Sequence, residues 1–366
     1  MNVTQLNLVH FRNYNRASFS FEPNCIHILY GRNAQGKTNM IEAIYYLSHL
    51  HSFRTNVHMN LIEHGQETLI IDSKVETNQR NENLCVVIGQ QKKQLFRYKN
   101  PVTKYSDFVG IVNAILFCPD DMMIFSQPKK YRRKFIDMEL IKLSKTYTAT
   151  LSHYQNLLKE RNILLKKEKV NLPLLEVYTS QMIADQKIIL LQRKQFISDL
   201  ISKAKALYPF FCNQKEEIDA HYETFVSFEK DLEEELNEVY QRALTKDLQY
   251  KQTTIGIHKD DVVFYLNGSL IQEVASQGQK RSYLLAIKLA LAQLIYEKSH
   301  QYPILLLDDV FSELDNHRKQ QLIQRLPKNM QIFITTTEPV DLRWMQDRKY
   351  KIYEIEQGSI KEVKYV

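Results

Sequence analysis

The chain has 366 residues, of which 44% are hydrophobic and 25% charged, and it carries a net charge of +7. It contains no run of about 18 uncharged apolar residues, and its first residues lack a basic segment followed by an apolar core, so we expect neither a transmembrane helix nor a secretory signal. Four single cysteines without a C-x-x-C pair argue against a zinc site or a disulfide scaffold and indicate a reducing, cytoplasmic setting. The length suggests two or three domains, and the basic excess is compatible with a polyanionic partner.

Strand-like segments recur through the first 117 residues. Alternating apolar residues predict strands within 3–8 and 19–21, and further strands are predicted at 25–30, 69–71, 84–88, 94–98 and 114–117. Between the first two strands, Phe11-Arg12-Asn13-Tyr14 is interpreted as a turn that exposes aromatic and basic groups. This third of the chain is therefore predicted to be α/β with several antiparallel strands.

A glycine loop follows the strand at 25–30. Gly31-Arg32-Asn33-Ala34-Gln35-Gly36-Lys37-Thr38 matches the pattern G-x-x-x-x-G-K-[ST] in full, and apolar residues recur at helical spacing after it. A strand, a glycine loop and a helix N-terminus point several backbone N–H groups at one spot, which makes a site for phosphate. We expect ATP to bind along the whole loop, with Lys37 reaching the β- and γ-phosphates and Thr38 ligating Mg²⁺.

The sequence pattern predicts that the middle of the chain is helical. An apolar stripe from Leu140 to Leu165 predicts one long amphipathic helix, a second helix is predicted from near Ser180 to Pro209, and a third around 232–243. Glycine is absent from 111 to 255, which suits a helical arm. The predicted arrangement is one α/β ATPase lobe made from 1–120 and 250–366, with residues 121–249 inserted as a mostly helical arm lobe.

Strands return in the last third. They are predicted at 262–266, closed by the hairpin pair Asn267-Gly268, and at 303–307 and 331–335, with an apolar helix at about 282–298 between them. The strand at 303–307 runs into Asp308 and Asp309. Such a strand end places a carboxylate beside the glycine loop, so Asp308 is predicted on the metal side and Asp309 is predicted to orient the attacking water. Lys37 and Asp309 are thus the predicted catalytic residues.

A second candidate anion site precedes the helix at 282. Ser276-Gln277-Gly278-Gln279 offers a hydroxyl and glycine amides at a helix N-terminus, although such a sequence alone is usually only an N-cap. Two phosphate-binding helix ends on distant parts of one chain can serve one nucleotide when two copies face each other. In that arrangement, Ser276, Gly278 and Gln279 are the candidate contacts to ATP from a second copy.

Together these segments resemble the ATPase heads of the ABC class found in SMC and Rad50 proteins, and more closely the RecF family of bacterial recombination mediators. The glycine loop with Asn39, the S-x-G-Q sequence, L-L-D-D-V-F-S-E-L-D at 306–315 and the threonine run 335–337 carry the resemblance. It continues over nearly the whole chain in F-R-N-Y at 11–14, S-F-R-T at 52–55, R-R-K-F-I-D at 132–137, R-N-I-L-L at 161–165 and G-I-H-K-D-D at 256–261.

The resemblance implies an ATP-dependent DNA-binding protein of recombinational repair and replication-gap processing. It implies a head-to-tail homodimer with two sandwiched ATP molecules, slow hydrolysis that resets the clamp, and loading of RecA with RecO and RecR at gaps and single-strand to double-strand junctions. The same resemblance implies a weak ATPase used as a switch. Asp309 stands where many ABC ATPases have glutamate, and the threonine run stands where transporters have a histidine, so the identity of the general base stays open.

The densest basic run is Lys129-Lys130-Tyr131-Arg132-Arg133-Lys134. Lys129, Lys130, Arg132 and Lys134 are candidate phosphate contacts with DNA, whereas the alternative is a solvated helix face and, for Arg133, a structural role.

Other classes fit the sequence less well. A P-loop phosphotransferase needs no signature serine from a second copy, a transporter ATPase has much less chain between Lys37 and Asp308, and a fused nuclease would need more chain after the last strand. An ABC or SMC-like switch that acts on a different polyanionic or protein partner stays open as the alternative.

Overall fold

The computed structural model describes residues 1–78, 80–90, 92–212, 215–337, 342–345 and 348–365. The chain divides into two compact units, of which unit 1 comprises Met1–Met122, Lys203–Lys215 and Ser276–Val366, and unit 2 comprises Met123–Ser202 and Glu216–Ala275. Relative to the lobes expected from the sequence, residues 121–122 and 203–215 lie in unit 1 and 250–275 lie in unit 2. The division of the chain into an ATPase lobe and an arm lobe remains a prediction.

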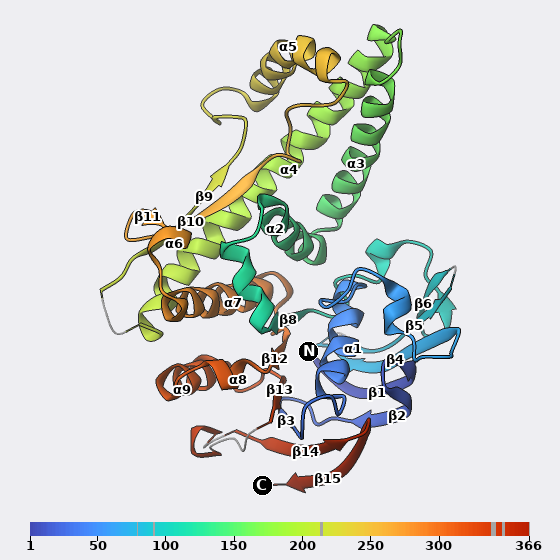
Figure 1. The fold of residues 1–366 in the computed structure, drawn as a ribbon, viewed down its shortest axis with the longest axis vertical. Coiled ribbons are helices and arrows are strands. Elements are labelled where there is room, and N and C mark those ends of the chain that lie inside the picture. Colours follow the sequence, from blue (N-terminus) through green and yellow to red (C-terminus); the bar gives the residue numbers. More distant parts are fainter. Residues whose placement is uncertain (79, 91, 213–214, 338–341, 346–347, 366) are drawn as a thin grey trace. The chain divides into compact units, whose positions relative to one another are not determined.

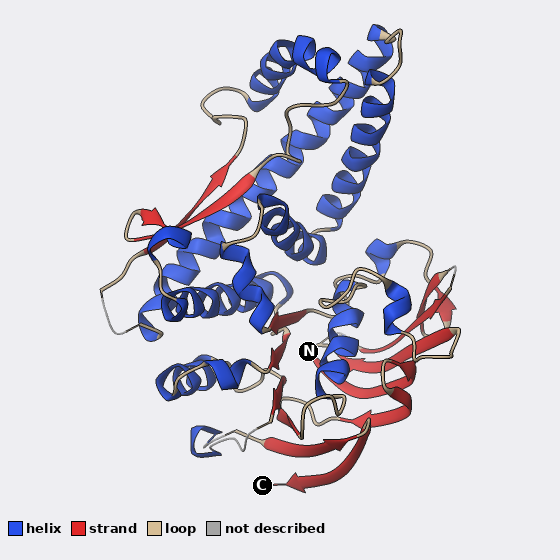
Figure 2. Ribbon diagram, viewed as in Figure 1, coloured by secondary structure: helices blue, strands red, loops and turns tan. Residues whose placement is uncertain are grey.

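Unit 1 contains a mixed six-stranded sheet that carries the glycine loop (Figures 1 and 2). Its strand order is β15-β14-β3-β13-β12-β8, and β3 pairs in parallel with both β13 and β14. The apolar runs predicted as buried parallel strands are confirmed, because every residue of β12 and β13 is buried. The strands are β3 (Ile26–Tyr30), β8 (Ala114–Phe117), β12 (Ile304–Asp308), β13 (Ile332–Thr336), β14 (Tyr350–Glu356) and β15 (Ser359–Tyr365).

The second sheet of unit 1 is antiparallel, in the order β2-β1-β4-β5-β6-β7. Burial alternates along β4 and β5, as expected for strands with one face on the core. The prediction of several antiparallel strands in the first third is thereby confirmed. The strands are β1 (Asn2–Phe11), β2 (Tyr14–Ser20), β4 (Thr68–Glu76), β5 (Asn81–Gly89), β6 (Lys93–Arg97) and β7 (Asn100–Pro101).

The core of unit 1 is continuous from one sheet to the other. Helix α1 (Lys37–His49) buries Met40, Ile41, Ile44 and Leu47 in one cluster with apolar residues of both sheets. The other helices of this unit are α7 (Gln277–Ser299), α8 (Val310–Glu313) and α9 (Asn316–Arg325). Short 3-10 turns lie at η1 (His58–Leu61), η2 (Tyr105–Asp107), η3 (Pro119–Phe125), η4 (Tyr208–Phe210) and η5 (Leu342–Met345). Among the described residues, none of the helices has the length and apolarity needed to cross a membrane.

Unit 2 is mostly helical, with a small sheet in the order β11-β10-β9. Helices α3 and α4 lie side by side (Figure 1) and are joined by the Arg161–Thr179 hydrogen bond at 3.0 Å and the His153–Asp185 contact at 2.8 Å. The hairpin predicted at Asn267-Gly268 connects β10 to β11, whereas β9 was not predicted. The elements are α2 (Lys129–Leu143), α3 (Lys145–Leu165), α4 (Leu172–Leu207, in unit 1 from Lys203), β9 (Ile218–Glu223), α5 (Leu232–Tyr250), β10 (Asp261–Leu266), β11 (Ser269–Leu270) and α6 (Ile271–Val274).

Three predicted helix boundaries were wrong. Helix α7 begins at Gln277 rather than at about 282. The stripe from Leu140 to Leu165 belongs to two helices, because Ser144 is extended and its side chain caps α3 by accepting a hydrogen bond from the Tyr147 N–H at 3.1 Å. Helix α4 begins at Leu172 rather than near Ser180. Its start is set by Asn171, whose side chain accepts from the Leu174 N–H.

The turn at 11–14 also differs from its prediction. The turn exists, but Phe11 and Tyr14 are 0% and 1% exposed rather than presented to solvent. Both rings pack in the core shared by the two sheets, and the Tyr14 hydroxyl donates to the carbonyl of Gly36 at 2.9 Å. The turn therefore supports the glycine loop instead of forming a free aromatic surface.

Candidate functional site

The glycine loop, residues 31–36 between β3 and α1, leaves no room for a Cβ at its two glycines. A Cβ on Gly31 would lie 2.4 Å from the carbonyl oxygen of Ile355, and Gly36 has φ +113 with the Tyr14 hydroxyl 2.9 Å from where its Cβ would be. Both glycines are therefore required by close approach, and Gly36 also by a left-handed backbone. The loop leads directly into the first turn of α1, as the sequence pattern predicted.

Lys37 folds back over this loop. Its Nζ donates to the carbonyl oxygens of Gly31 at 2.6 Å and Arg32 at 2.7 Å, and the residue is buried. Burial lowers the pKa of Lys37, while the nearby Asp309 and Asp308 oppose this shift. The ammonium group is thus held by the backbone of the loop that it is predicted to serve.

Asp308 lies at the end of β12 and accepts two hydroxyl hydrogen bonds. Thr38 Oγ1 and Thr335 Oγ1 each donate to Asp308 Oδ1 at 2.8 Å. Burial raises the pKa of this carboxyl, and the two hydroxyl donors partly offset the effect. The two residues predicted on the metal side, Thr38 and Asp308, are therefore brought together.

Asp309 occupies a left-handed backbone conformation with φ +54 directly before α8. Its N–H donates to Thr335 Oγ1 at 2.9 Å, so one threonine hydroxyl contacts both aspartates. Left-handed backbone is uncommon outside glycine, and aspartate tolerates it better than most residues. This conformation turns Asp309 away from the line of β12 and into the wall of a pocket.

A pocket of about 270 Å³ lies over the glycine loop and contains most of the predicted nucleotide contacts. Its lining includes 33–38 of the loop and Asp309. It also includes five residues that were not assigned to the site from the sequence, namely Asn13, Asn39, Arg54, Thr335 and Thr337. Asn13, Arg54 and the threonines do occur in the segments that carry the family resemblance. Their occurrence in these segments was the signal available from the sequence. It did not show which residues of the segments line the pocket.

The signature segment Ser276 to Gln279 does not line this pocket. It forms a capping box at the start of α7, in which the Ser276 hydroxyl accepts from the Gln279 N–H at 3.2 Å and the Gln279 side chain accepts from the Ser276 N–H at 2.7 Å. Ser276 is exposed and Gly278 and Gln279 are partly exposed. Within one chain, the structure therefore separates the signature residues from the glycine-loop pocket.

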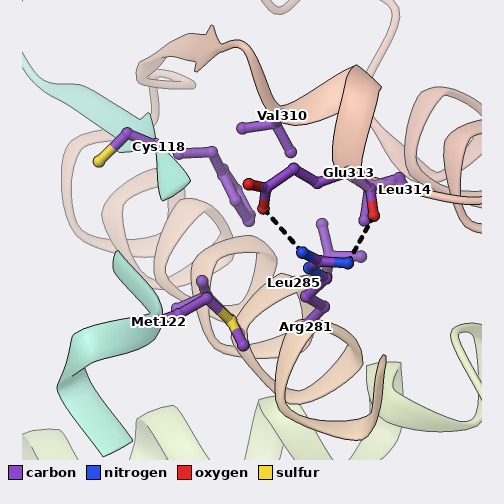
Figure 3. Close-up of a pocket in the computed structure, with 9 residues that line it drawn as sticks. Cys118, Met122, Arg281, Leu285, Val310, Glu313 and Leu314 are labelled. Atoms are coloured by element: carbon purple, nitrogen blue, oxygen red, sulfur yellow. Dashed lines mark hydrogen bonds and ion pairs between the residues drawn. The ribbon is translucent and has the colours of Figure 1, made fainter. Parts of the chain in front are cut away.

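The start of α7 is tied to the segment that follows β12. Arg281 donates to the carbonyl oxygen of Glu313 at 2.9 Å and pairs with its carboxylate at 3.2 Å (Figure 3). Arg318, which forms an ion pair with Asp315, also donates to Ser282 Oγ at 2.8 Å. The signature segment and the acidic strand end thus belong to one hydrogen-bonded framework.

The basic run lies on α2 in unit 2, and its members have different environments. Lys129, Lys130 and Lys134 are exposed. Arg132 instead makes a two-point ion pair with Asp261 at 2.7 and 2.8 Å, and Arg133 donates to the carbonyl oxygen of Asp260 at 2.7 Å. Three lysines therefore remain available for phosphate, whereas the two arginines hold α2 to the start of β10.

The G-I-H-K-D-D segment at 256–261 is a hydrogen-bonding centre of unit 2. Asp260 accepts from Arg193, Tyr222 and Thr224, while the His258 ring contacts the hydroxyl of Tyr154 at 2.8 Å. Burial lowers the pKa of His258 to about 4. These contacts give the segment, whose role the sequence left open, a structural role in unit 2.

A mixed sheet with a P-loop, a buried strand that ends in two aspartates and a capped signature helix define an ATPase head of the ABC and SMC class. A family model described as the RecF/RecN/SMC N terminal domain matches residues 2–361. The chain belongs to the RecF family of DNA replication and repair proteins.

Relatives and solved structures cover nearly the whole chain. The DNA replication and repair protein RecF of Halalkalibacterium halodurans is 36% identical over 99% of this chain and 100% of its own length, and RecF of Streptococcus agalactiae serotype V is 34% identical over 98% and 97%. A structure of the recombination mediator protein RecF with ATP, in the RecFOR pathway, covers 100% of this chain and 97% of its own at 27% identity and a TM-score of 0.89. An Smc head bound to the C-terminal winged helix domain of ScpA covers 100% and 98% at 12% identity and a TM-score of 0.57, which shows a shared fold.

Proposed function

We propose that this chain is an ATP-dependent DNA-binding protein of recombinational repair and replication-gap processing. The observation that carries the proposal is the Thr38–Asp308 contact beside the pocket over the glycine loop, which joins the two sequence motifs that an ATPase of this class requires. The related RecF structure with ATP supports the nucleotide, and the relatives' assignment to DNA replication and repair supports the process.

ATP would lie on the backbone N–H groups of residues 31–38, with Lys37 exchanging its carbonyl contacts for phosphate oxygens. Thr38 and Asp308 offer a hydroxyl and a carboxylate oxygen, the ligand types that suit Mg²⁺ when phosphates and water complete its coordination. Bound Mg²⁺ would supply charge stabilisation to the phosphates during hydrolysis. Asp309, on the pocket wall, is our candidate for orienting the attacking water.

A head-to-tail homodimer would complete the site. Ser276, Gly278 and Gln279 do not line the pocket of their own chain, and Ser276 is exposed at the start of α7. A second copy could therefore present its signature segment to the nucleotide, so that occupancy by ATP favours dimerisation. Slow hydrolysis would then reset the protein to monomers, which makes ATP a switch.

The DNA target would be gapped DNA and junctions between single and double strands. Lys129, Lys130 and Lys134 are the exposed cations of the basic run that we propose for phosphate contacts, and Arg132 would act mainly by holding α2. The place of a related protein in the RecFOR pathway supports action with RecO and RecR to load RecA, in the cytoplasm and as part of the response to DNA damage.

Gel filtration with ATP and Mg²⁺ tests the proposal, using the wild type beside Lys37→Ala and Ser276→Arg. The wild type is expected to shift to a dimer with ATP and both variants are expected to stay monomeric. A wild type that stays monomeric with ATP, or a Ser276→Arg variant that dimerises normally, would contradict the sandwich arrangement.

A further inference from the structure

Helix α4 carries a line of apolar residues on its exposed face. Leu174, Val177, Ile188 and Leu191 are 38%, 49%, 40% and 50% exposed, and Ala184 between them is also exposed. The helix packs on its own chain through other apolar residues, which are buried. A single exposed leucine needs no explanation, whereas five apolar residues along one face of one helix indicate a surface that binds a partner. We call this face of residues 174–198 the α4 stripe.

The α4 stripe follows a heptad repeat, abcdefg, in which positions a and d face a neighbouring helix. All of its residues at these positions are exposed. Its positions a are Leu174, Gln181, Ile188 and Gln195. Its positions d are Val177, Ala184, Leu191 and Ser198. The exposed face of α4 is thus typical of one strand of a short two-stranded coiled coil.

The charges beside the α4 stripe have opposite signs on its two sides. Lys187 and Lys194 occupy positions g, and Asp185 and Asp199 occupy positions e. In a parallel pair of helices a g residue faces the e residue of the next heptad, so Lys194 of one copy would meet Asp199 of the other. In an antiparallel pair g faces g and e faces e, so lysine would meet lysine and aspartate would meet aspartate. The charge pattern therefore matches a second copy of the same helix in parallel orientation.

Lys194 and Asp199 carry most of this complementarity. Lys187 and Asp185 already form ion pairs within their own chain. Lys194 is exposed, and its Nζ lies 4.0 Å from the centroid of the Phe228 ring, a contact that leaves its N–H groups able to donate to a carboxylate. A parallel pair would contain this lysine–aspartate contact twice, once on each side.

We propose that the α4 stripe pairs in parallel with the α4 stripe of a second copy, at a contact separate from the nucleotide sandwich. The stripe is about 37 Å long and about 10 Å wide, so a pair buries on the order of 800 Å² in total. Stable interfaces bury at least about 1,200 Å², so this pairing is weak in free solution and strengthens where copies are held close together. Combined with the sandwich contact, it would join dimers into an open chain.

Cross-linking of the full chain without nucleotide, over a concentration series, tests the pairing and its direction. Val177→Cys and Ser198→Cys place thiols at positions d about 32 Å apart along the helix, beyond the reach of a short bismaleimide. Each variant should cross-link to itself, and a mixture of the two should give products between like positions only. The wild type, with its four own cysteines, and Leu244→Cys, an exposed position on α5, are the controls and should give at least about tenfold less product.

Charge reversal in the Val177→Cys chain distinguishes a parallel pair from an antiparallel one. Lys194→Glu should lower the cross-linked fraction about threefold, because it faces Asp199 of the other copy, and adding Asp199→Lys should restore it. Leu191→Glu should lower the fraction about tenfold, because it brings two charges into the apolar contact. Leu244→Glu is the matched control, since Leu244 is 37% exposed on another helix, and it should leave the fraction unchanged.

Three results would each overturn the inference. They are product no more abundant than in the controls at every concentration, a product between positions 177 and 198, and a cross-linked fraction that rises with Lys194→Glu or does not change with Leu191→Glu. Lys37→Ala, which removes a proposed nucleotide contact, should leave the cross-linking unchanged. Cross-linking that requires Lys37 and ATP would show that the pairing is not separate from the sandwich, whereas failure of the sandwich dimer in gel filtration would leave this inference standing.

Discussion

Thr38 Oγ1 donates to Asp308 Oδ1 at 2.8 Å, although the two residues are 270 positions apart in sequence. Thr335 Oγ1 reaches the same carboxylate oxygen from β13. Three segments that are distant along the chain therefore converge on one buried acidic side chain. In the described part of the chain, the hydrogen-bond donors to this carboxylate are the two threonine hydroxyls, and burial disfavours its charged form. This has a measurable effect on stability.

We expect Asp308→Asn to stabilise the folded protein relative to the wild type at neutral pH, by roughly 0.5–2 kcal/mol. The pKa of Asp308 is raised in the folded state by burial. Below the pKa of Asp308 in the unfolded state, the carboxyl is protonated in both the folded and the unfolded protein. Above its raised pKa in the folded state, the folded protein carries the full cost of the buried charge. The contribution of Asp308 to wild-type stability therefore falls as pH rises between these two pKa values. Denaturant unfolding from pH 3.5 to 7.5 should show the advantage of the variant growing with pH. A difference that shrinks with rising pH would contradict the prediction.

Ser276 allows the capping role to be separated from the proposed contact with ATP. Ser276→Ala should lower the free energy of unfolding by about 1 kcal/mol, because it removes the hydroxyl of the capping box. Ser276→Asp retains a good N-cap but places a negative charge toward the phosphates of a second copy. Thermal unfolding should show near wild-type stability for Ser276→Asp, while gel filtration with ATP should show that its dimer is lost. If Ser276→Asp dimerises normally, Ser276 caps α7 but does not contact ATP in a second copy.

Gly256→Ala should destabilise unit 2 by on the order of 2–4 kcal/mol. Gly256 has φ +127, and an added Cβ would lie within 3.0 Å of the polar ends of Tyr154, Gln186 and Tyr240, all of which are buried. Gly268→Ala is the matched control, since Gly268 has φ +78 but open space around it, and should cost roughly 1 kcal/mol. Urea unfolding of both variants measures the difference. If the two variants lose the same free energy of unfolding, the crowded surroundings of Gly256 add nothing to the cost of its positive φ.

Substitutions in the basic run at 129–134 should have two different effects, one on DNA binding and one on stability. Lys130→Ala and Lys134→Ala should each reduce the salt dependence of DNA binding by about one unit in the slope of log affinity against log salt, if each lysine contacts one phosphate. Arg132→Ala should instead lower the stability of unit 2, because it leaves Asp261 without its arginine. Fluorescence anisotropy over a salt series, with thermal unfolding beside it, measures both. A slope unchanged by either lysine variant would exclude these residues as phosphate contacts.

Continuous sequence patterns predicted the nucleotide-binding framework well. The glycine loop and the strand that ends at Asp308 each depend on neighbouring residues, so local chemistry was enough, and the same holds for the hairpin at Asn267-Gly268 in unit 2. The break at Ser144 was missed because the apolar spacing continues across it and the cap is a single hydroxyl.

The parts of the site that could not be predicted depend on contacts between distant segments. Arg54 stands in an irregular loop, and nothing in its local sequence shows that Glu42 and Asn39 hold it at the pocket. Phe11 and Tyr14 were interpreted as exposed members of a turn, yet both lie in the core between two sheets. Burial of this kind is set by tertiary packing rather than by local sequence.

The position of β3 between β13 and β14 has a consequence for the order of events during protein synthesis. Both hydrogen-bonding neighbours of the strand that leads into the glycine loop come from residues after 331. Asp308 and its donor Thr335 also belong to the last sixth of the chain. A ribosome must therefore release nearly the whole polypeptide before the nucleotide site can assemble, so truncated nascent chains carry the loop sequence without the sheet that shapes it.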